Sequence, residues 1–487
     1  MPKDKKSKYR ILKKTKIVAT VGPTTSSVKT LKEIFKGGVN VARLNFSHGD
    51  HETHLTMIKR IRRVSHEIGK PVAVMVDLSG PKMRTGDLED GAVKLSKGKT
   101  LTLVTKKQLG TAERMFVNYK KLPREVEKGQ IILLDDGRRV LKVLETSDNS
   151  IVCRIMVGGT IKGRRGVTVP GAHLSMSSLT AKDRRDVAFA LEQDIDLFAL
   201  SYVRSAKDIV ELKRLITRLG GDSKVMAKIE TAEAVDDIDA IVDEADAIMV
   251  ARGDLAIEIP REDVPMIQKR IVNKCNAVGK PVVIATQMLE SMITAPVPTR
   301  AEVSDVANSI LDGADGVMLS QETAMGEYPV EAVRVMATVA RKIESELPRK
   351  GGLDRQGFYS REIRRHHTVD AISTAAVQAA IDVKAVAIVA LTESGLTGRM
   401  LSRFRPPMPI IVMSPNVSTI RYSQLYFGAY PHKISGFQYV SQVTDDVKKI
   451  LLEMGVGKLG DRIVIAAGVP FGKVGGTNMV LVSKIGE

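Results

Sequence analysis

Three charged residues in two short runs have the types and spacing that could carry chemistry. Lys228 and Glu230 lie two positions apart at the end of VMAKIE, and Asp254 lies in ARGDLAIEI. Side chains two apart on a strand point the same way, so Lys228 and Glu230 should face one side. Two carboxylates that leave coordination positions to water and substrate oxygens suit Mg²⁺ or Mn²⁺. A simple salt bridge between Lys228 and one of these carboxylates is the alternative explanation.

A lysine beside such a metal site has a chemical use. Its ammonium could stabilise negative charge that develops on a transferred phosphoryl group or on an enolate oxygen. The elements that carry these residues must therefore bring separate runs of the chain to one place.

The first two-thirds of the chain alternates β-rich runs with amphipathic helical patterns. This rhythm predicts a parallel sheet, and eight strands that are mostly each followed by a helix indicate a (β/α)₈ TIM barrel in the α/β class. The expected strand regions are residues 15–22, 39–47, 71–79, 196–203, 224–230, 247–255, 281–289 and 316–320.

The rhythm breaks once, between residues 82 and 173. Runs of β-forming residues separated by turn sequences such as DDG and DNS predict a small β-barrel lid domain there, inserted after the third barrel strand. Residues 1–81 and 174–348 then form the catalytic barrel. After the basic connector PRKGGLDRQGFYSREIRR, an Ala-rich helix and four β-rich runs predict a C-terminal α/β domain over residues 349–487.

Barrel enzymes place their reactive groups at the carboxyl ends of the strands. Because Glu230 and Asp254 follow adjacent strands, we expect their carboxylates to converge. His48 could act there as a base or only as a hydrogen-bonding residue. The polar residues expected at this rim are Arg43, Asn45, Ser47, His48, Asp77, Lys228, Glu230, Asp254, Thr286, Ser320 and Glu322.

Composition restricts the class of protein. The 487 residues predict two to four domains. No apolar stretch approaches the roughly 20 residues that cross a bilayer, and the charged N-terminus lacks the apolar region of a secretory signal. Cys153 and Cys275 have no C-x-x-C spacing, which argues against a disulfide framework and against a zinc site. We therefore expect a cytoplasmic protein without a membrane partner.

The formal net charge of +18 raises the alternative of an RNA-binding protein. The basic residues are dispersed, however, and aromatic residues make up only 4%, so platforms for stacking bases are scarce. We favour an enzyme that attracts phosphorylated metabolites. The chain has neither a P-loop motif nor a glycine fingerprint after its first strand, so phosphate would be held by metal, arginine, lysine or backbone amides.

From about residue 15 to its end, the chain resembles the pyruvate kinase family. The resemblance implies transfer of a phosphoryl group from phosphoenolpyruvate to ADP, giving pyruvate and ATP. It also implies a homotetramer of subunits with barrel, lid and regulatory domains. The blocks that carry the resemblance include TKIVATVGP, GVNVARLNFSHG, DLSGPKMRTG, LLDDG, GVTVPG, MAKIET, MVARGDLAIEIP, IATQMLESMI, PTRAEVSDVANSILDGADGVMLSQETAMGEYP and LTESG.

Roles carried over from the family follow these blocks. Glu230 and Asp254 would hold Mg²⁺ or Mn²⁺, Lys228 would stabilise the phosphoryl group and enolate oxygen, and Arg43 would neutralise phosphate charge. Backbone amides around Gly253 and Asp254 would hold the substrate carboxylate. The side chains expected near the methylene carbon that takes up a proton are Thr286 and Ser320. The residues expected to border the nucleotide are Pro23, Asn45, His48, Arg84, Asp136 and Arg165.

One departure from the family pattern concerns a monovalent cation. Many members carry glutamate where this chain has Lys82, and use it with K⁺ bound by an asparagine, a serine and an aspartate. The ammonium of Lys82 could replace that positive charge, so we predict activity without K⁺; an exposed lysine with no such role is the alternative. The residues of this region are Asn45, Ser47, Asp77, Leu78 and Lys82. Ala256 and Gln321 are smaller departures, at positions where the family commonly has glycine.

The run TESGLTGR resembles the family's loop for an effector phosphate. Hydroxyls and amides at a helix start could bind the phosphate of a sugar-phosphate or AMP effector, and plain helix capping is the alternative. The loop residues are Thr392, Glu393, Ser394, Gly395, Leu396 and Thr397. A second enzyme hypothesis is a metal-dependent lyase or aldolase acting on pyruvate enolate. It would need neither the inserted domain nor the lysine of KIET.

Overall fold

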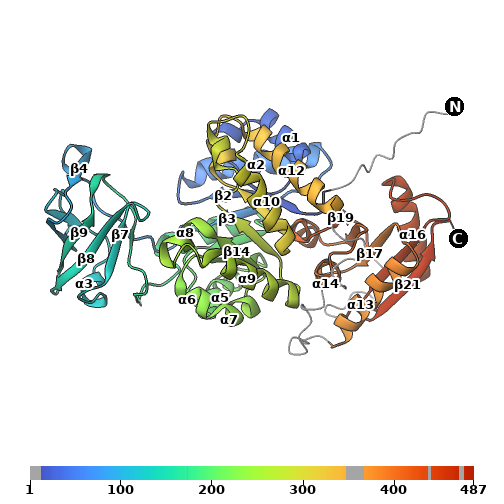
Figure 1. Cartoon of the computed structure of the whole chain (residues 1–487). Coiled ribbons are helices and arrows are strands. Elements are labelled where there is room, and N and C mark those ends of the chain that lie inside the picture. Colours follow the sequence, from blue (N-terminus) through green and yellow to red (C-terminus); the bar gives the residue numbers. More distant parts are fainter. Residues whose placement is uncertain (1–12, 173, 347–366, 437–439, 471–475, 487) are drawn as a thin grey trace.

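The computed structural model of the chain places three bodies in a row, with the barrel between the inserted β domain and the C-terminal domain (Figure 1). It describes residues 13–172, 174–346, 367–436, 440–470 and 476–486. The charged N-terminal segment 1–12 and the basic connector considered above lie outside the described residues.

Eight parallel strands close into a barrel, as the alternating pattern predicted. Around the barrel the order is β1-β16-β15-β14-β13-β12-β3-β2. The strands are β1 (Lys16–Thr20), β2 (Val39–Asn45), β3 (Ala73–Asp77), β12 (Leu197–Leu200), β13 (Lys224–Ile229), β14 (Ala247–Ala251), β15 (Val282–Ala285) and β16 (Gly316–Leu319).

Helices surround the barrel, and several begin at caps that the sequence encodes. Thr180 with Asp183 and Thr299 with Glu302 form capping boxes, each of which satisfies free amides of a first helical turn. The helices of this layer are α1 (Val28–Gly37), α2 (His51–Glu67), α4 (Ala181–Leu191), α5 (Ala206–Arg218), α6 (Ala232–Asp236), α7 (Ile238–Glu244), α8 (Arg252–Glu258), α9 (Val264–Val278), α10 (Arg300–Asp312), α11 (Gln321–Ala324) and α12 (Pro329–Glu346).

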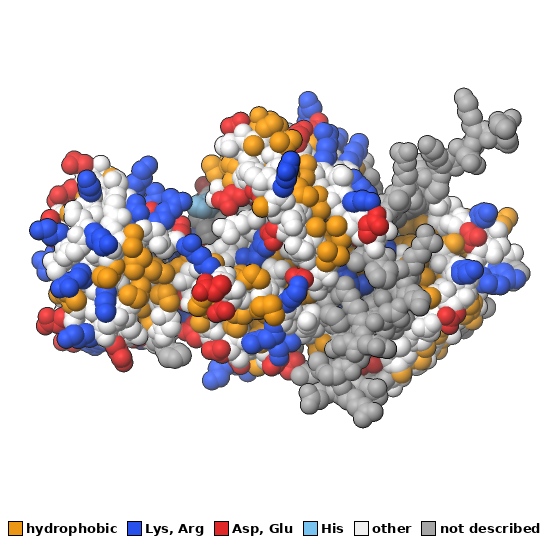
Figure 2. Space-filling view, viewed as in Figure 1, with side chains coloured by type: hydrophobic (Ala, Val, Ile, Leu, Met, Phe, Trp, Pro, Cys, Tyr) orange, Lys and Arg blue, Asp and Glu red, His pale blue; other side chains and the backbone are white. Residues whose placement is uncertain are grey.

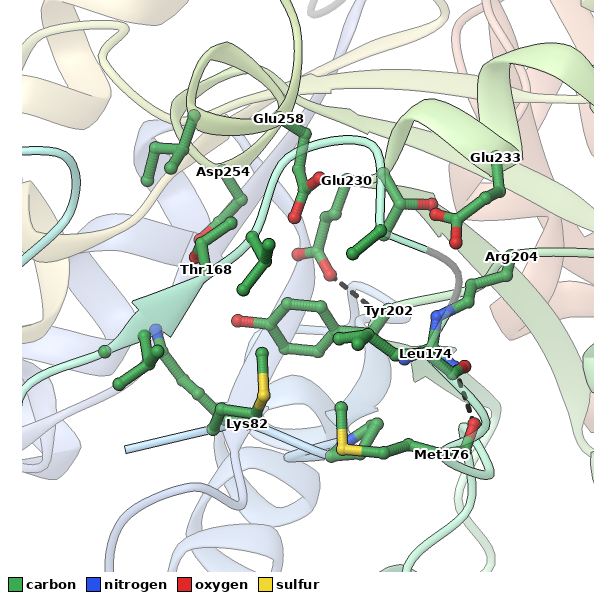
Figure 3. Close-up of a pocket in the computed structure, with 18 of the residues that line it drawn as sticks. Lys82, Thr168, Leu174, Met176, Tyr202, Arg204, Glu230, Glu233, Asp254 and Glu258 are labelled. Carbon is green, nitrogen blue, oxygen red and sulfur yellow. Dashed lines mark hydrogen bonds between the residues drawn. The ribbon is translucent and has the colours of Figure 1, made fainter. Parts of the chain in front are cut away.

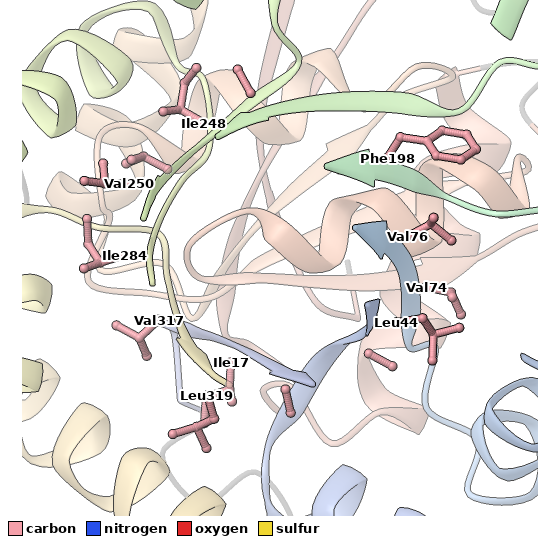
Figure 4. Packing of buried hydrophobic residues seen from close by; sticks show 14 of the residues in the cluster. Ile17, Leu44, Val74, Val76, Phe198, Ile248, Val250, Ile284, Val317 and Leu319 are labelled. Carbon is pink, nitrogen blue, oxygen red and sulfur yellow. The ribbon is translucent and has the colours of Figure 1, made fainter. Parts of the chain in front are cut away.

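The barrel core follows the two-residue period of its strands. One set of side chains points outward against the helices, as Figure 4 shows for Ile17, Val74, Phe198 and Val250 among others. The alternate positions belong to a second buried cluster, which includes Val18, Val41, Met75, Ala199, Met226, Met249, Val283 and Met318. The direction of any strand residue therefore follows from its position relative to these two sets.

Two strands end earlier than the sequence pattern predicted. The run 247–255 was expected to be one buried strand, but β14 stops at Ala251 and Arg-Gly-Asp opens α8. The run 281–289 was expected to continue likewise, but β15 stops at Ala285, and Thr286 and Gln287 have positive φ angles of 69° and 54°. Both predictions were wrong because apolar side chains in the elements that follow, such as Leu255 in α8 and Met288 in the loop after β15, are buried outside any strand.

The insertion after β3 is mostly β, with one short α-helix and a 3-10 helix at Glu89–Gly91, and it projects to one side of the barrel (Figure 1). Its six-stranded sheet has the order β11-β7-β8-β9-β5-β6, and β10 pairs with β4 in a separate ribbon. The elements are β4 (Ala92–Leu95), β5 (Thr100–Val104), β6 (Arg114–Phe116), α3 (Leu122–Glu125), β7 (Ile131–Leu134), β8 (Arg139–Thr146), β9 (Ser150–Val157), β10 (Gly159–Lys162) and β11 (Val167–Thr168).

The C-terminal domain is a five-stranded α/β sheet in the order β19-β18-β17-β20-β21. The edge strand β19 (Ala429–Lys433) was not predicted, because its sequence AYPHK contains proline and lacks an apolar run. The remaining elements are α13 (His367–Asp382), β17 (Ala387–Leu391), α14 (Leu396–Ser402), β18 (Ile410–Ser414), α15 (Val417–Tyr422), α16 (Val440–Glu453), β20 (Arg462–Ala467) and β21 (Met479–Lys484). Across the described ranges, no helix combines the length and apolar character needed to cross a bilayer.

A buried arginine ties this domain to the barrel. The guanidinium of Arg405 donates 2.8 Å hydrogen bonds to the carbonyl oxygens of Gly313 and Ala314 and lies 3.7 Å from the carboxylate of Asp315. It also stacks 3.7 Å above the ring of Phe427. One side chain from the C-terminal domain therefore satisfies three polar groups of the barrel.

Replacing this arginine should destabilise the protein. Arg405→Met would remove the buried cation beside Asp315 and one hydrogen bond from each of two buried carbonyls, at a cost of about 3 kcal/mol. We expect a lower thermal midpoint in differential scanning calorimetry. Arg334→Met is the matched control, because Arg334 is 63% exposed on α12. Equal midpoints for the two variants would contradict this role for Arg405.

Candidate active site

The site forms where the inward-facing positions of the strands reach the carboxyl end of the barrel. The inward series Met226 continues to Lys228 on β13, and the series Val41 continues to Arg43 on β2. Asp77 ends β3 in the same way. The two-residue period of the strands thus carries apolar positions in the middle of the barrel and charged positions at its mouth.

Asp77 is the hub of this polar layer and is 1% exposed. One carboxylate oxygen accepts from Arg43 Nε at 2.7 Å. The other lies 3.4 Å from Lys228 Nζ and accepts from Ser201 Oγ at 3.2 Å. Burial by itself would raise the pKa of Asp77, but Lys228 and Arg43 outweigh it and hold the pKa below its ordinary value. Asp77 therefore stays ionised and fixes both cations.

Lys228 has two further partners. Its ammonium lies 2.7 Å from Glu230 Oε1 and donates to Ser201 Oγ at 2.8 Å. Burial acts to lower the pKa of Lys228, but Asp77 and Glu230 overcome that effect and raise it. The salt bridge that sequence analysis gave as the alternative explanation is therefore present, and it keeps a charged ammonium in the barrel mouth at neutral pH.

Glu230 also faces a cavity between the barrel and the inserted domain, which we call the lid cavity (Figure 3). Its Oε2 accepts from the backbone amide of Tyr202 at 2.8 Å. The residues that line the lid cavity include Lys82, Asp136, Thr168, Leu174, Met176, Tyr202, Arg204, Glu230, Glu233, Asp254 and Glu258.

Glu230 and Asp254 come together there, as predicted from their adjacent strands. Burial is the main effect on Glu230 and raises its pKa; Lys228 opposes that shift and the Asp254 carboxylate adds to it. Two carboxylates that repel each other in a buried cavity form an oxygen donor set that suits a hard divalent cation. Within the described residues, no three His, Cys, Asp or Glu side chains group as metal ligands. Substrate oxygens and water would have to complete the coordination.

Glu258 is a third carboxylate at the lid cavity, which sequence analysis missed. Burial raises its pKa to about 7, with Glu233 adding to the shift. It lies one helical turn after Asp254 on α8, so both side chains share one face of that helix. Sequence analysis ended its predicted strand at residue 255, whereas α8 continues to Glu258 and so carries this carboxylate to the lid cavity.

A second opening, the rim cleft, lies over the barrel mouth beside α2. Figure 2 shows a hollow between the inserted domain and the barrel, bordered by Lys and Arg side chains of the inserted domain. Lys82 and Asp254 line both openings, so the two are continuous at these residues. The predicted residues that line the rim cleft are Pro23, Arg43, Asn45, His48, Lys82, Lys228, Asp254, Thr286 and Ser320.

Some predicted residues lie apart from both openings. Arg84 and Arg165 lie on the inserted domain and line neither opening. The backbone of Arg84 forms an isolated β-bridge with Gly166. The side chain of Arg165 forms an ion pair with Asp135 at 3.5 Å. Asp136 is the predicted nucleotide residue of that domain that reaches the lid cavity.

The residues predicted to replace a monovalent cation lie at and beyond the ends of two neighbouring strands, where Asn45 of β2 is the register partner of Asp77 of β3. Asn45 Oδ1 accepts from the amide of the exposed Ser47, and Leu78 is fully buried. A side-chain carbon added at Gly166 would meet Lys82 Cε at 3.5 Å, and Lys82 lines both the lid cavity and the rim cleft. Lys82 therefore stands between the two openings.

Thr286 and Ser320 are each held by a neighbouring element. Thr286 Oγ1 accepts from the amide of Gly253 at 2.8 Å, so the start of α8 contacts the loop after β15. The amide of Ser320 donates to Glu322 Oε2 at 2.7 Å, and Glu322 Oε1 accepts from the amide of Leu289. Glu322, which is 3% exposed, thereby joins two loops of the rim.

In the C-terminal domain, the predicted effector loop is compact. Thr392 Oγ1 accepts from the amide of Gly395, whose φ of 86° suits glycine. Thr397 and Thr477 share a 2.8 Å hydrogen bond between their buried hydroxyls. Ser394 is the exposed hydroxyl of the loop.

Comparison with known proteins now agrees with this geometry. The family model described as the pyruvate kinase barrel domain matches residues 12–333, and the model of the pyruvate kinase alpha/beta domain matches residues 370–483. This chain belongs to the pyruvate kinase family. It is therefore an enzyme of the phosphotransferase class.

Curated relatives and a solved structure support the assignment. Pyruvate kinase of Bacillus licheniformis is 42% identical over 98% of this chain and 81% of its own. Pyruvate kinase of Clostridium perfringens is 40% identical over 97% of this chain and 100% of its own. A solved pyruvate kinase from Cryptosporidium parvum has a TM-score of 0.92 and 36% identity, covering 97% of this chain and 96% of that chain.

The raised pKa of Glu258 makes a pH prediction for this pyruvate kinase family member. A carboxyl that titrates near 7 when folded, against an ordinary value of 4.5, binds more protons in the folded state, so stability falls as pH rises between these values. The loss is at most about 3 kcal/mol. With EDTA present, the thermal midpoint of Glu258→Gln should therefore fall less between pH 5 and pH 8 than that of the native chain.

The control for this prediction is Glu331→Gln, because Glu331 is 45% exposed on α12. That variant should retain the pH dependence of the native protein. Parallel curves for the native chain and Glu258→Gln would contradict the assignment of a neutral Glu258 below pH 7.

Proposed function

We propose that this enzyme transfers the phosphoryl group of phosphoenolpyruvate to ADP with the help of Mg²⁺ or Mn²⁺, giving pyruvate and ATP. The observation that carries the proposal is the buried cluster in which Asp77 holds Arg43 and Lys228 beside Glu230. The names of the relatives support the substrates. In the reaction the bond from phosphorus to the enol oxygen breaks, a β-phosphate oxygen of ADP takes the phosphoryl group, and the methylene carbon takes up a proton.

Phosphoryl transfer asks a protein mainly for positioning and for stabilisation of charge. Lys228 would meet the charge that passes to the enol oxygen when the phosphorus–oxygen bond breaks. Arg43 would neutralise charge on the phosphoryl group itself. Both cations are already fixed by Asp77, so little reorganisation is needed at the moment of reaction.

Glu230 and Asp254 would hold the divalent cation. When bound, the ion would supply positive charge to the oxygens of the substrate. The two carboxylates would leave the rest of its coordination to those oxygens and to water, which matches a site that must admit and release substrate.

Protonation of the enolate requires a donor near the methylene carbon. Thr286 and Ser320 line the rim cleft with Lys228, so their hydroxyls could relay a proton from water. The amides at the start of α8 would bind the substrate carboxylate. Since Thr286 Oγ1 already accepts from Gly253, the carboxylate would compete for that amide or use the next one.

The nucleotide would bind in the rim cleft against Pro23, Asn45 and His48, with Asp136 facing it from the inserted domain. Movement of that domain toward the barrel would bring Arg84 and Arg165 to the phosphates and exclude water. We further propose a cytoplasmic homotetramer. The effector loop, in which Ser394 is the exposed hydroxyl, would bind the phosphate of a sugar-phosphate or AMP effector.

The decisive test is a turnover assay with phosphoenolpyruvate, ADP and Mg²⁺ in which pyruvate is detected. Lys228→Met should lower kcat by several orders of magnitude, because the buried site would lose the cation at the enol oxygen. EDTA should abolish turnover of the native enzyme, and Mg²⁺ should restore it. Lys342→Met is the matched control, since Lys342 is 72% exposed on α12.

The outcomes separate the candidate functions. Turnover retained in Lys228→Met would overturn the assignment of that lysine. A lyase or aldolase would act on an enolate precursor without ADP.

The predicted independence from K⁺ has its own test. In buffers whose only monovalent cations are bulky amines, the native enzyme should reach nearly full kcat, because the ammonium of Lys82 supplies the charge. Lys82→Glu should depend on added KCl, because it removes that charge and creates a carboxylate. A large stimulation of the native enzyme by KCl would contradict the proposal.

A further inference from the structure

The loop after β15 contains backbone strain at the proposed site of proton transfer. Thr286 and Gln287 have φ angles of 69° and 54°, in the left-handed region that favours glycine. A β-branched threonine at positive φ is a genuine outlier. Such conformations persist only where the surroundings enforce them, and they concentrate at functional sites. The contacts that enforce this one are therefore informative.

Arg252 makes those contacts from the first position of α8. Its Nη2 donates to the carbonyl oxygen of Thr286 at 2.9 Å and to that of Gln287 at 3.4 Å. The same guanidinium grips Asp305 of α10 with two 2.6 Å hydrogen bonds, one to each carboxylate oxygen. The side chain of Arg252 is 12% exposed, so this forked ion pair is largely shielded from water.

The neighbouring residue fixes the side chain of the same threonine. The amide of Gly253 donates to Thr286 Oγ1 at 2.8 Å, and that hydroxyl donates to the carbonyl oxygen of Ala285 at 2.6 Å. Gly253 also allows the close approach, because a side-chain carbon there would lie 3.2 Å from Thr286 Oγ1. Two consecutive residues thus hold the backbone and the hydroxyl of Thr286.

We propose that Arg252, anchored by Asp305, is a positioning residue that holds Thr286 and Gln287 in the left-handed conformation and so directs the Thr286 hydroxyl in the rim cleft. This inference rests on the proposed role of Thr286 near the methylene carbon. It gives the Arg-Gly-Asp run one task for each residue: Arg252 fixes the backbone, Gly253 admits the hydroxyl and Asp254 faces the metal position.

The proposal is tested by removing the clamp and then relieving the strain that it opposes. Arg252→Met should lower kcat by about 10- to 100-fold, the range expected when a reacting group is misplaced by about 1 Å. The KM for ADP should change little. Adding Gln287→Gly to Arg252→Met should recover a large part of kcat, because glycine adopts positive φ at little cost.

The matched control is Gln287→Ala in the same Arg252→Met background. It removes the same exposed side chain but does not favour positive φ, so it should give no recovery. Gln287→Gly in the otherwise native chain gives the reference rate. Equal recovery with alanine and glycine, or none with either, would overturn the clamp, as would native kcat in Arg252→Met.

Two further variants separate this inference from its foundation. If Thr286→Ala keeps native turnover, the proposed role of Thr286 fails. If Thr286→Ala is impaired and Arg252→Met adds a further full loss to it, the arginine does not act through the threonine and only the clamp fails.

Circular dichroism and the thermal midpoint would show whether each variant folds. Should Arg252→Met not fold, Asp305→Asn is expected to give the same pattern with a smaller loss, and native kcat there would overturn the proposal.

Discussion

A single buried carboxylate, that of Asp77, is the constraint on which the mouth of this barrel depends. It lies between two cationic side chains, Arg43 at 2.7 Å and Lys228 at 3.4 Å, in a layer almost closed to water. Without it, two neighbouring positive charges would be buried together at high cost. With it, both remain charged at neutral pH and stay fixed in place, which is the condition for stabilising a transferring phosphoryl group.

Two carboxyl groups of the lid cavity differ from Asp77 in the direction of their pKa shift: the pKa values of Glu230 and Glu258 are raised, whereas that of Asp77 is lowered. The lid cavity is lined by two cationic side chains, Lys82 and Arg204, and by more carboxylates, and burial shifts the pKa values of Glu230 and Glu258 upward. The carboxylates are Asp136, Glu230, Glu233, Asp254 and Glu258. A cation bound in this cavity would reduce the repulsion between these carboxylates and favour their ionised form. The mouth of the barrel is therefore balanced in charge on one side and short of positive charge on the other. This asymmetry gives the proposed reaction separate positions for fixed and exchangeable cations.

The loops add a second kind of preorganisation, which is geometric. Regular strands can aim side chains only along two directions, inward or outward. Thr286 lies beyond the end of β15, where its direction is set by contacts with α8 and not by the sheet. Contacts of this loop with α8, which is anchored on α10, offset the free-energy cost of its strained backbone.

The sequence by itself determined the barrel, the site of the insertion and the family, because hydrophobic periodicity and motif order are properties of the linear chain. The two-residue period also predicted that Lys228 and Glu230 face one side and that Asp254 approaches them. Only the tertiary structure decided that Asp77 bridges two cations, that Glu258 joins the cavity and that β14 and β15 end early. These features arise from burial and from contacts between segments far apart in sequence, which no local pattern records.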